Sequence, residues 1–458
     1  MPKKKTALTI EERLQQALVP AEEQPYEVPE NWVWVRLGSL LKEIKNGTTI
    51  KQDKSGNGFS VTRIESLQNQ TIDLMRVGTI LETEKIKETD WYKSGDITLS
   101  HINSIEHVGK TALITDAMLP LVHGMNLLRL RFFEIYTPDL FQLYSQTYQY
   151  KNEIRSRINM AVNQVSINQK QLSSLEIPLP PLSEQQRIVE RIEELFAKLD
   201  EAKERLQEVA DSFAVRKAAI LHKAFTGELT KQWRLENGVS DESWEDVSLD
   251  SVCKSIYDGD HMPPPKSETG IPFLVISNVN TGFISFEKCR FVPEEYYDGL
   301  SETRTPEIGD ILYTIVGSYG IPVMVDTDKK FCFQRHMALL KPKDIYNRFL
   351  WRQLQTQSFF EQATSIATGT AQLTVPIKGL RKLIVKCPTL PEQHEIVRLI
   401  DDLLARERSA QQATEQALAS IDLMKKSILA RAFRGELGTN KASEASALEL
   451  LRQVLAEG

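Results

Sequence analysis

Two stretches of this 458-residue chain contain loops whose polar side chains could hydrogen-bond to the edges of nucleic-acid bases. Arg and Lys suit guanine, Asn and Gln suit adenine, and Ser and Thr can position phosphates. The candidates in the first stretch are Thr48, Thr49, Lys51, Arg63, Ser100, His101, Asn103, Asn163 and Gln164. Those in the second are His261, Lys266, Ser277, Asn278, Ser318, Tyr319, Gln334, Arg335, His336, Thr370 and Gln372. For each residue, the alternative is an ordinary solvated loop position.

The sequence contains no common catalytic motif. It has no GxxxxGK[ST] phosphate loop, no GxGxxG opening a helix, no GxSxG and no HExxH. It also lacks the Asn/Asp-Pro-Pro-aromatic tetrapeptide with which amino-methyltransferases hold a flipped base. His101 and His107 lie close together but have no Cys nearby, so we expect no catalytic site and no metal site.

Composition excludes few partners but indicates a soluble protein. The net charge is −6, with 41% hydrophobic and 26% charged residues, and affinity for nucleic acid depends on local basic surfaces rather than on this sum. The four cysteines are widely spaced without a CxxC, which favours reduced thiols. No apolar run resembles a signal peptide or a membrane span, so we expect a cytoplasmic protein.

The strongest organisational signal is an internal repeat. Residues 172–229 align with residues 380–437 at a constant offset of 208 without insertion, and the copies close on Ala-Phe-x-Gly-Glu-Leu. Gln164 and Gln372 are equivalent under this offset, which gives that pair extra weight. In the residues before each copy of the repeat, the two halves resemble each other more weakly. The shared features there are Trp-x-x-Val-x-Leu at 32 and 244, Asn46-Gly47 against Asp258-Gly259, and Gly-Asp-Ile at 95 and 309. A repeat of this period predicts two domain-sized halves.

Each repeat contains a long helical pattern. Apolar residues from Ile188 to Ile220, Val209 among them, follow heptad spacing, and Gly227 suits the residue after the helix. The second copy, from Ile396 to Ile428, is less regular because Glu407 and Thr414 fall on seam positions. Each helix should be about 60 Å long. A two-fold relation between the halves predicts an antiparallel coiled coil that holds two heads apart.

The predicted fold is therefore α+β, with two mixed α/β heads separated by two long antiparallel coiled-coil helices in a pseudo-two-fold, circular arrangement. Short helical patterns near both termini, the first with Thr9 and Glu12 as a capping box, should pack together and close the ring. The expected divisions are an N-terminal extension (1–27), a first head (28–182), a central helix (183–226), a linker (227–243), a second head (244–390), a C-terminal helix (391–434) and a tail (435–458).

These features together resemble the specificity subunit of a type I restriction–modification enzyme. The resemblance rests on Pro-x-Leu-x-Glu-Gln-x-x-Ile-Val-x-x-Ile, on Ala-Phe-x-Gly-Glu-Leu and on the entry Pro-Glu-Asn-Trp-Val-Trp-Val-Arg-Leu-Gly at 29–38. It implies that 28–182 and 244–390 are target-recognition domains, each reading half of a bipartite site in double-stranded DNA. The helices would set the unread gap and dock modification subunits, two of them by this symmetry.

The resemblance also assigns the chemistry to partners. S-adenosylmethionine would be used by the modification subunits, and ATP with Mg²⁺ by the restriction subunits, whereas this chain would bind no cofactor. Two alternatives are a DNA-modifying enzyme with an unrecognised site and a coiled-coil scaffold that binds proteins. The sequence does not indicate which bases are read or how many base pairs separate them.

Overall fold

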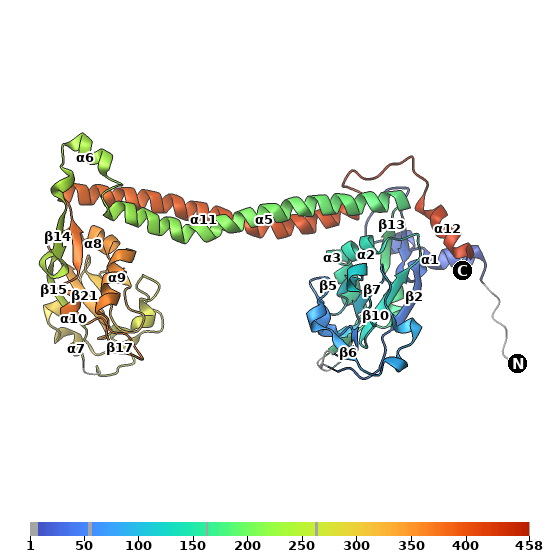
Figure 1. Ribbon diagram of the computed structural model, residues 1–458, viewed down its shortest axis with the longest axis horizontal. Coiled ribbons are helices and arrows are strands. Elements are labelled where there is room, and N and C mark those ends of the chain that lie inside the picture. Colours follow the sequence, from blue (N-terminus) through green and yellow to red (C-terminus); the bar gives the residue numbers. More distant parts are fainter. Residues whose placement is uncertain (1–7, 54–56, 162–163, 262–263, 458) are drawn as a thin grey trace. The chain divides into compact units, whose positions relative to one another are not determined.

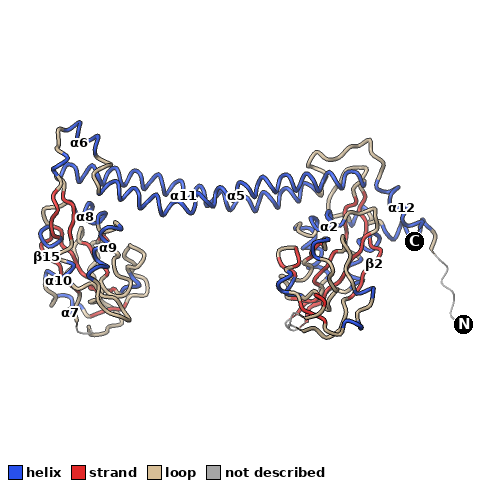
Figure 2. The backbone as a smooth tube through the Cα atoms, in the orientation of Figure 1, coloured by secondary structure: helices blue, strands red, loops and turns tan. Residues whose placement is uncertain are grey.

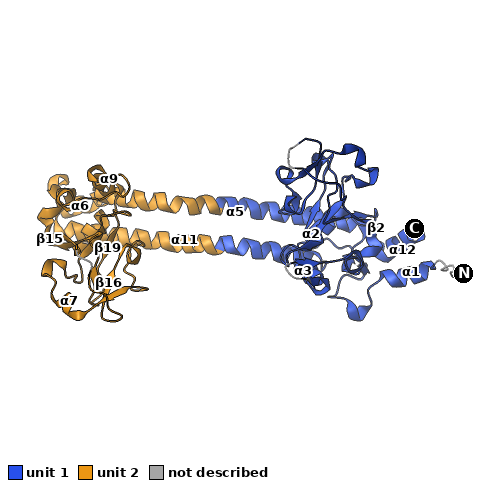
Figure 3. Ribbon diagram, turned by 90° about the horizontal axis from the view of Figure 1, so that it is seen from below, with its two compact units in different colours: residues 1–205, 417–458 blue, residues 206–416 orange. Residues whose placement is uncertain are grey.

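A computed structural model describes residues 8–53, 57–161, 164–261 and 264–457 (Figure 1). The chain divides into two compact units, which we call unit 1 (residues 1–205 and 417–458) and unit 2 (residues 206–416) (Figure 3). Each unit contains one mixed head and a segment of both long helices. Strands lie inside each head with helices and loops around them (Figure 2).

The head of unit 1 is built on a four-stranded antiparallel sheet. Its order is β2 (Leu41–Asn46), β10 (Leu127–Phe132), β7 (Ile97–Ser100) and β9 (Thr111–Leu113). The smaller sheets are β1 (Val33–Arg36) with β13 (Glu176–Leu179), β11 (Asn159–Ala161) with β12 (Gln164–Ser166) and β8 (Ile102–Asn103), β3 (Phe59–Val61) with β6 (Gly78–Ile80), and β4 (Leu67–Gln68) with β5 (Thr71–Ile72). The helices are α1 (Ile10–Ala17), α2 (Pro138–Tyr144), α3 (Tyr148–Arg157), α4 (Gln169–Ser173) and α12 (Ala447–Glu457).

The head of unit 2 repeats the main sheet. Its order is β15 (Cys253–Asp258), β21 (Met337–Pro342), β18 (Ile311–Thr314) and β19 (Pro322–Met324), again antiparallel. Beside it lie β14 (Glu245–Ser248) with β22 (Ile384–Cys387), and β17 (Arg290–Val292) with β16 (Ile271–Leu274) and β20 (Cys332–Phe333), the last two parallel. The short helices are α6 (Lys231–Asn237), α7 (Glu294–Asp298), α8 (Asn347–Gln353), α9 (Gln357–Ile366) and α10 (Ile377–Leu380).

The Gly-Asp-Ile sequence that occurs in both halves contains an aspartate that forms an equivalent ion pair in each main sheet. Asp96 directly precedes β7 and accepts from Arg131 on β10 at 2.7 Å. Asp310 directly precedes β18 and accepts from Lys341 on β21 at the same distance. Both aspartates are nearly fully buried, so each needs this partner. The weak sequence echo thus identified equivalent sheet positions whose role is structural.

The two long helices are α5 (Leu182–Phe225) and α11 (Leu390–Ala432). Pro391 stands in the first turn of α11, where the missing N–H costs nothing. Gly227 has φ +77° two residues after the last residue of α5, which confirms its predicted role in ending that helix. Both helices were expected from the heptad spacing, and the predicted α+β fold with two mixed heads is confirmed.

Within each unit the two helix segments run antiparallel. In unit 1, Asp200 of α5 pairs with Lys425 of α11 at 2.5 Å; in unit 2, Arg216 pairs with Glu407 at 2.9 Å. Glu407, an irregularity of the predicted seam, is therefore neutralised across the helix pair. Thr414, the other irregularity, is buried, and its hydroxyl donates to Ala410 O one turn earlier in α11.

The seam is tightest where a head covers it. Ile188 and Ile192 are fully buried in unit 1, and Ile396 and Ile400 are fully buried in unit 2. Val209, predicted on the seam, is 40% exposed, so that assignment is wrong. Phe213, four residues further along α5, is buried, so the buried stripe of α5 passes beside Val209.

The terminal helices pack together within unit 1. Leu14 and Ala17 of α1 and Ala447 and Leu451 of α12 share one apolar cluster, and Arg13 donates to Leu455 O at 3.2 Å. The capping box at the start of α1, formed by Thr9 and Glu12, is also present. Both sequence-based predictions about these helices are confirmed.

Replacing Leu451 with Ala should lower the free energy of unfolding by about 2–4 kcal/mol, because its side chain is fully buried between α12 and the head. Leu235→Ala is the matched control, since Leu235 is 71% exposed on α6 and should cost less than about 0.5 kcal/mol. Differential scanning calorimetry of both variants measures the contrast. Equal shifts in unfolding temperature would show that α12 adds no stability to the head.

Candidate nucleic-acid interface

A buried Gln at the start of each long helix holds the adjoining head. Gln185 accepts from Thr137 N at 2.9 Å and donates to Ile135 O at 2.8 Å. Gln393 accepts from Tyr346 N at 2.8 Å and donates to Pro388 O at the same distance. One amide side chain thus satisfies a backbone donor and a backbone acceptor that would otherwise be buried without partners. The orientation of each head on its helix depends on this residue.

The Glu that directly precedes each of these Gln residues binds the segment that follows the other long helix. Glu184 accepts from Thr439 at 3.1 Å and from Asn440 at 2.8 Å, both after α11. Glu392 accepts from Thr230 and Arg234, both after α5, at 2.7 Å each. Both carboxylates are fully buried. The Glu-Gln pair in the repeat therefore joins a helix start, a head and the end of the other helix.

Replacing Glu392 with Ala should destabilise unit 2 by about 3–5 kcal/mol, because Arg234 would lose a buried partner. The matched control on the same helix is Glu395→Ala, whose ion pair with Arg398 is at the surface. We expect the control to cost less than about 1 kcal/mol. Chemical denaturation followed by circular dichroism compares them, and similar midpoints would show that the buried pair is dispensable.

The candidate residues after β2 and β15 are positioned by a close crossing of two chain segments. A Cβ on Gly47 would lie 1.8 Å from Gly124 O, and one on Gly259 would lie 2.3 Å from Phe333 O. Only glycine permits this approach. Thr48 is half-buried and donates its N–H to His123 O at 2.8 Å, which fixes the start of the following loop against the segment that contains His123. Thr49, Lys51, His261 and Lys266 are exposed.

A second group of candidates meets at a hairpin beside the main sheet. In unit 1, β12 begins at the exposed Gln164 and pairs with β8, which ends at Asn103. In unit 2 the equivalent segment turns back at the exposed Thr370 and Gln372, and Leu373 O accepts from Gly317 N at 2.9 Å. The structure thus places Gln164 next to the Val165–Asn103 pair, with His101 opposite Ile167 just beyond the other end of β12, and it places Gln372 beside Gly317, which precedes Ser318 and Tyr319.

The loop before the last sheet strand carries the next candidates. Gln334, Arg335 and His336 lie between β20 and β21, and Arg335 is exposed. Burial, and then the charge of Arg335, lower the pKa of His336, so its ring is neutral near pH 7. The equivalent loop of unit 1 carries Met125, which is 44% exposed, and Asn126. Sequence inspection missed this loop because no motif distinguishes it.

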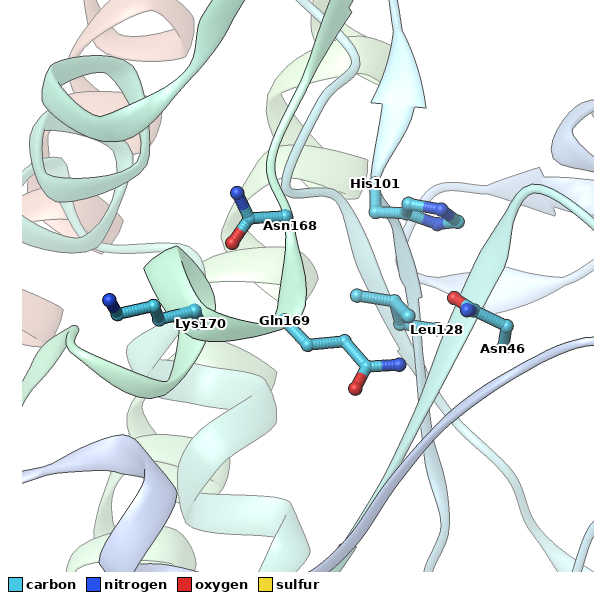
Figure 4. A pocket seen from close by; sticks show the side chains of 6 residues that line it. All are labelled: Asn46, His101, Leu128, Asn168, Gln169 and Lys170. Atoms are coloured by element: carbon cyan, nitrogen blue, oxygen red, sulfur yellow. The ribbon is translucent and has the colours of Figure 1, made fainter.

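A shallow cavity of about 510 Å³ adjoins His101 (Figure 4). The amides of Asn46 and Gln169 and the ring of His101 gather around Leu128 (Figure 4). Burial lowers the pKa of His101, although a hydrogen bond with the Asn126 backbone acts in the opposite direction. The Nδ1 atom of His101 has no partner among the described residues. The neutral ring and the amides present both donors and acceptors to this cavity. Asn168 and Lys170 complete its lining.

Three candidates are placed differently from the rest. Ser100 and Asn278 are buried, so both lie in the interior of their heads. Asn278 donates to Ser285 O and Glu287 O. Arg63 is half-buried and pairs with Glu65 at 2.9 Å. Ser277 is exposed beside Asn278. Asn163 lies outside the described residues.

The described residues offer no metal centre, since no three His, Cys, Asp or Glu side chains converge there. All four cysteines are free thiols, and burial raises the pKa of Cys253 and Cys332 to about 12. Among the described helices, none combines the length and the apolar composition required to cross a bilayer.

Comparison with known proteins gives consistent matches along the chain. The family described as "Type I restriction modification DNA specificity domain" matches residues 29–211 and 241–418. The EcoKI specificity subunit of Escherichia coli K12 is 26% identical over 94% of this chain and 96% of its own length. The EcoBI specificity subunit of Escherichia coli is 29% identical over 66% of this chain and 69% of its own.

A solved structure shares the fold. The HsdS subunit from Thermoanaerobacter tengcongensis has a TM-score of 0.65 at 20% identity, over 90% of this chain and 99% of that one.

Proposed function

Because the chain belongs to the type I restriction modification DNA specificity domain family, we propose that it is the sequence-reading subunit of a type I restriction–modification complex. One observation carries the proposal. The two units repeat one sheet order and one Glu-Gln junction, but equivalent loops present different exposed side chains, such as Met125 against Arg335. A common frame with two different sets of polar groups suits the reading of two different half-sites.

The proposed division of the chain follows the sequence expectation. Residues 28–182 and 244–390 are the target-recognition domains, and 183–226 and 391–434 are the helices that set the unread gap and dock modification subunits. Residues 227–243 and 435–458 are the segments that fasten each helix end. Partner subunits supply methylation with S-adenosylmethionine, and restriction with ATP and Mg²⁺.

The base contacts are proposed to come from the exposed candidates around the two hairpins and the loops after β2 and β15. Ser100 and Asn278 are left out of this set because they are buried. Asn46, Gln169, Met125 and Asn126 join it because they line or adjoin the same loops in unit 1.

The primary test is the pattern of methylated adenines in the host genome with and without this gene. A bipartite motif should disappear when the gene is deleted and return when it is restored. Persistence of every motif would overturn the proposal. Methylation or cleavage of DNA by the purified chain alone would instead support an enzyme, and assembly without DNA binding would support a scaffold.

Gln164→Ala and Gln372→Ala should each relax recognition in one half-site and leave the other half unchanged. A lost bidentate contact to a base reduces discrimination by about 1–3 kcal/mol. Sequencing of methylated sites in cells that carry each variant measures this change. Gln411→Ala, an exposed glutamine on α11, is the control and should leave both halves unchanged. Relaxation of both halves by one variant would contradict the assignment of one head to one half-site.

Insertion of one heptad into both α5 and α11 should lengthen the unread gap while both half-sequences stay the same. Seven residues add about 10 Å of helix, which corresponds to about three base pairs at 3.4 Å each. The same sequencing reads the gap directly. A changed half-sequence with an unchanged gap would show that the helices do not set the spacing.

A further inference from the structure

Four cationic side chains of unit 1 lie close together at the surface: Lys110, Lys151, Arg155 and Lys426, here called the basic cluster. All four are exposed, and among the described residues none of them has a carboxylate within ion-pair distance. The pKa of Lys151 is lowered by desolvation and then by the charges of Lys426, Arg155 and Lys110. The cations therefore repel one another without local compensation.

Three packed elements bring the basic cluster together. Tyr150 of α3 donates to Gly109 O at 2.9 Å, which holds the Lys110 loop against this helix. The rings of Tyr144 and Phe433 lie 4.9 Å apart, which holds the end of α11 against the same head. Both contacts belong to the unit 1 core, and α3 lies close to the helix pair there (Figure 1).

The basic cluster continues along the outer face of α3. Tyr148, Lys151 and Arg155 are spaced by three and four residues, so they share one face. Tyr148 is 80% exposed, whereas Tyr150 and Ile154 on the opposite face are buried. This short helix thus presents an aromatic ring and two cations to solvent.

The fold itself does not require these charges. Beside the basic cluster, Lys425 pairs with Asp200, and Arg157 pairs with Glu176. In unit 2 the equivalent position carries stacked rings of Tyr319 and Phe360, 5.5 Å apart and 8° from parallel. A head of this fold is therefore stable with an uncharged surface at this position.

We propose that the basic cluster binds a run of DNA phosphates beside the half-site read by unit 1, so that α11 contacts the DNA backbone as well as linking the units. The inference rests on the proposed function. It favours DNA over an acidic protein because one loop carries His101 and Asn103 at its beginning and Lys110 at its end. The phosphates bound by the basic cluster would then lie next to the bases that this loop contacts.

The test is equilibrium binding of the assembled complex to a duplex that contains its methylated motif, measured over a range of salt concentrations. Each phosphate contact contributes about 0.9 to the slope of log affinity against log salt. K151Q/R155Q should therefore lower the slope by about 2, and K426Q by about 1, with weaker binding to specific and unspecific duplexes alike. The preference for the specific duplex should stay unchanged.

The matched control is K42Q/K93Q, which removes two exposed lysines from the same head. If this control lowers the slope as much as K151Q/R155Q, net charge rather than the basic cluster explains the effect, and the inference fails. It fails also if K151Q/R155Q keeps the wild-type slope. Loss of modification subunits from that variant in mass photometry would then show that the cluster docks a protein. A wild-type complex without any sequence preference would instead overturn the proposed function.

Discussion

The junction at the start of each long helix is the interaction on which the rest of this structure depends. A buried Glu and the adjacent buried Gln, at 184–185 and again at 392–393, make hydrogen bonds to a head and to the segment that follows the opposite helix. Uncompensated, such groups would be among the most costly to bury. Because most of these bonds join parts distant in sequence, a head or a helix end that shifts would leave the carboxylate or the amide without partners.

The two junctions use the same positions but different chemistry. Glu184 is surrounded by neutral donors, namely Trp32, Thr439 and Asn440, whereas Glu392 meets the guanidinium of Arg234. In unit 2 the Nε1 atom of Trp244, the counterpart of Trp32, is buried without a partner among the described residues. The Oε2 atom of Glu392 also lacks a partner among the described residues, because Thr230 and Arg234 both bond to Oε1. The frame therefore tolerates exchange of its partners and a less complete set of bonds in unit 2.

Divergence increases with distance from the junction. The main sheets keep their order and the aspartate–cation pair, but the flanking strands pair to different extents. Unit 2 has a parallel pair of β16 and β20 where unit 1 has a single parallel bridge between Val61 and Val122, and unit 1 pairs β8 with β12 where unit 2 has a single bridge between Val316 and Thr374. At the surface the basic cluster of unit 1 is replaced by the Tyr319–Phe360 stack. This gradient is what a recognition protein needs, because packing constrains the interior while the exposed loops are free to acquire different contacts.

Much of the fold could be predicted from periodicity and the repeat. Heptad spacing predicted both long helices, Gly227 marked the end of one, and the capping box at Thr9 marked the start of α1. These features are local, so their signal lies within a few neighbouring residues. The exposure of Val209 was not predictable, because the heptad pattern does not show which of its positions the partner helix covers.

The candidate interface was less accessible to sequence reasoning. Residue type could not separate Asn278, which is buried and bonded within its own head, from exposed neighbours such as Ser277. It also missed Asn46 of β2 and Gln169 of α4, which line one cavity although they lie far apart in the chain. The sequence by itself determined the duplication, the helices and the family, since these depend on local pattern. Only the tertiary structure decided which side chains face solvent together, because that depends on contacts between residues far apart in the chain.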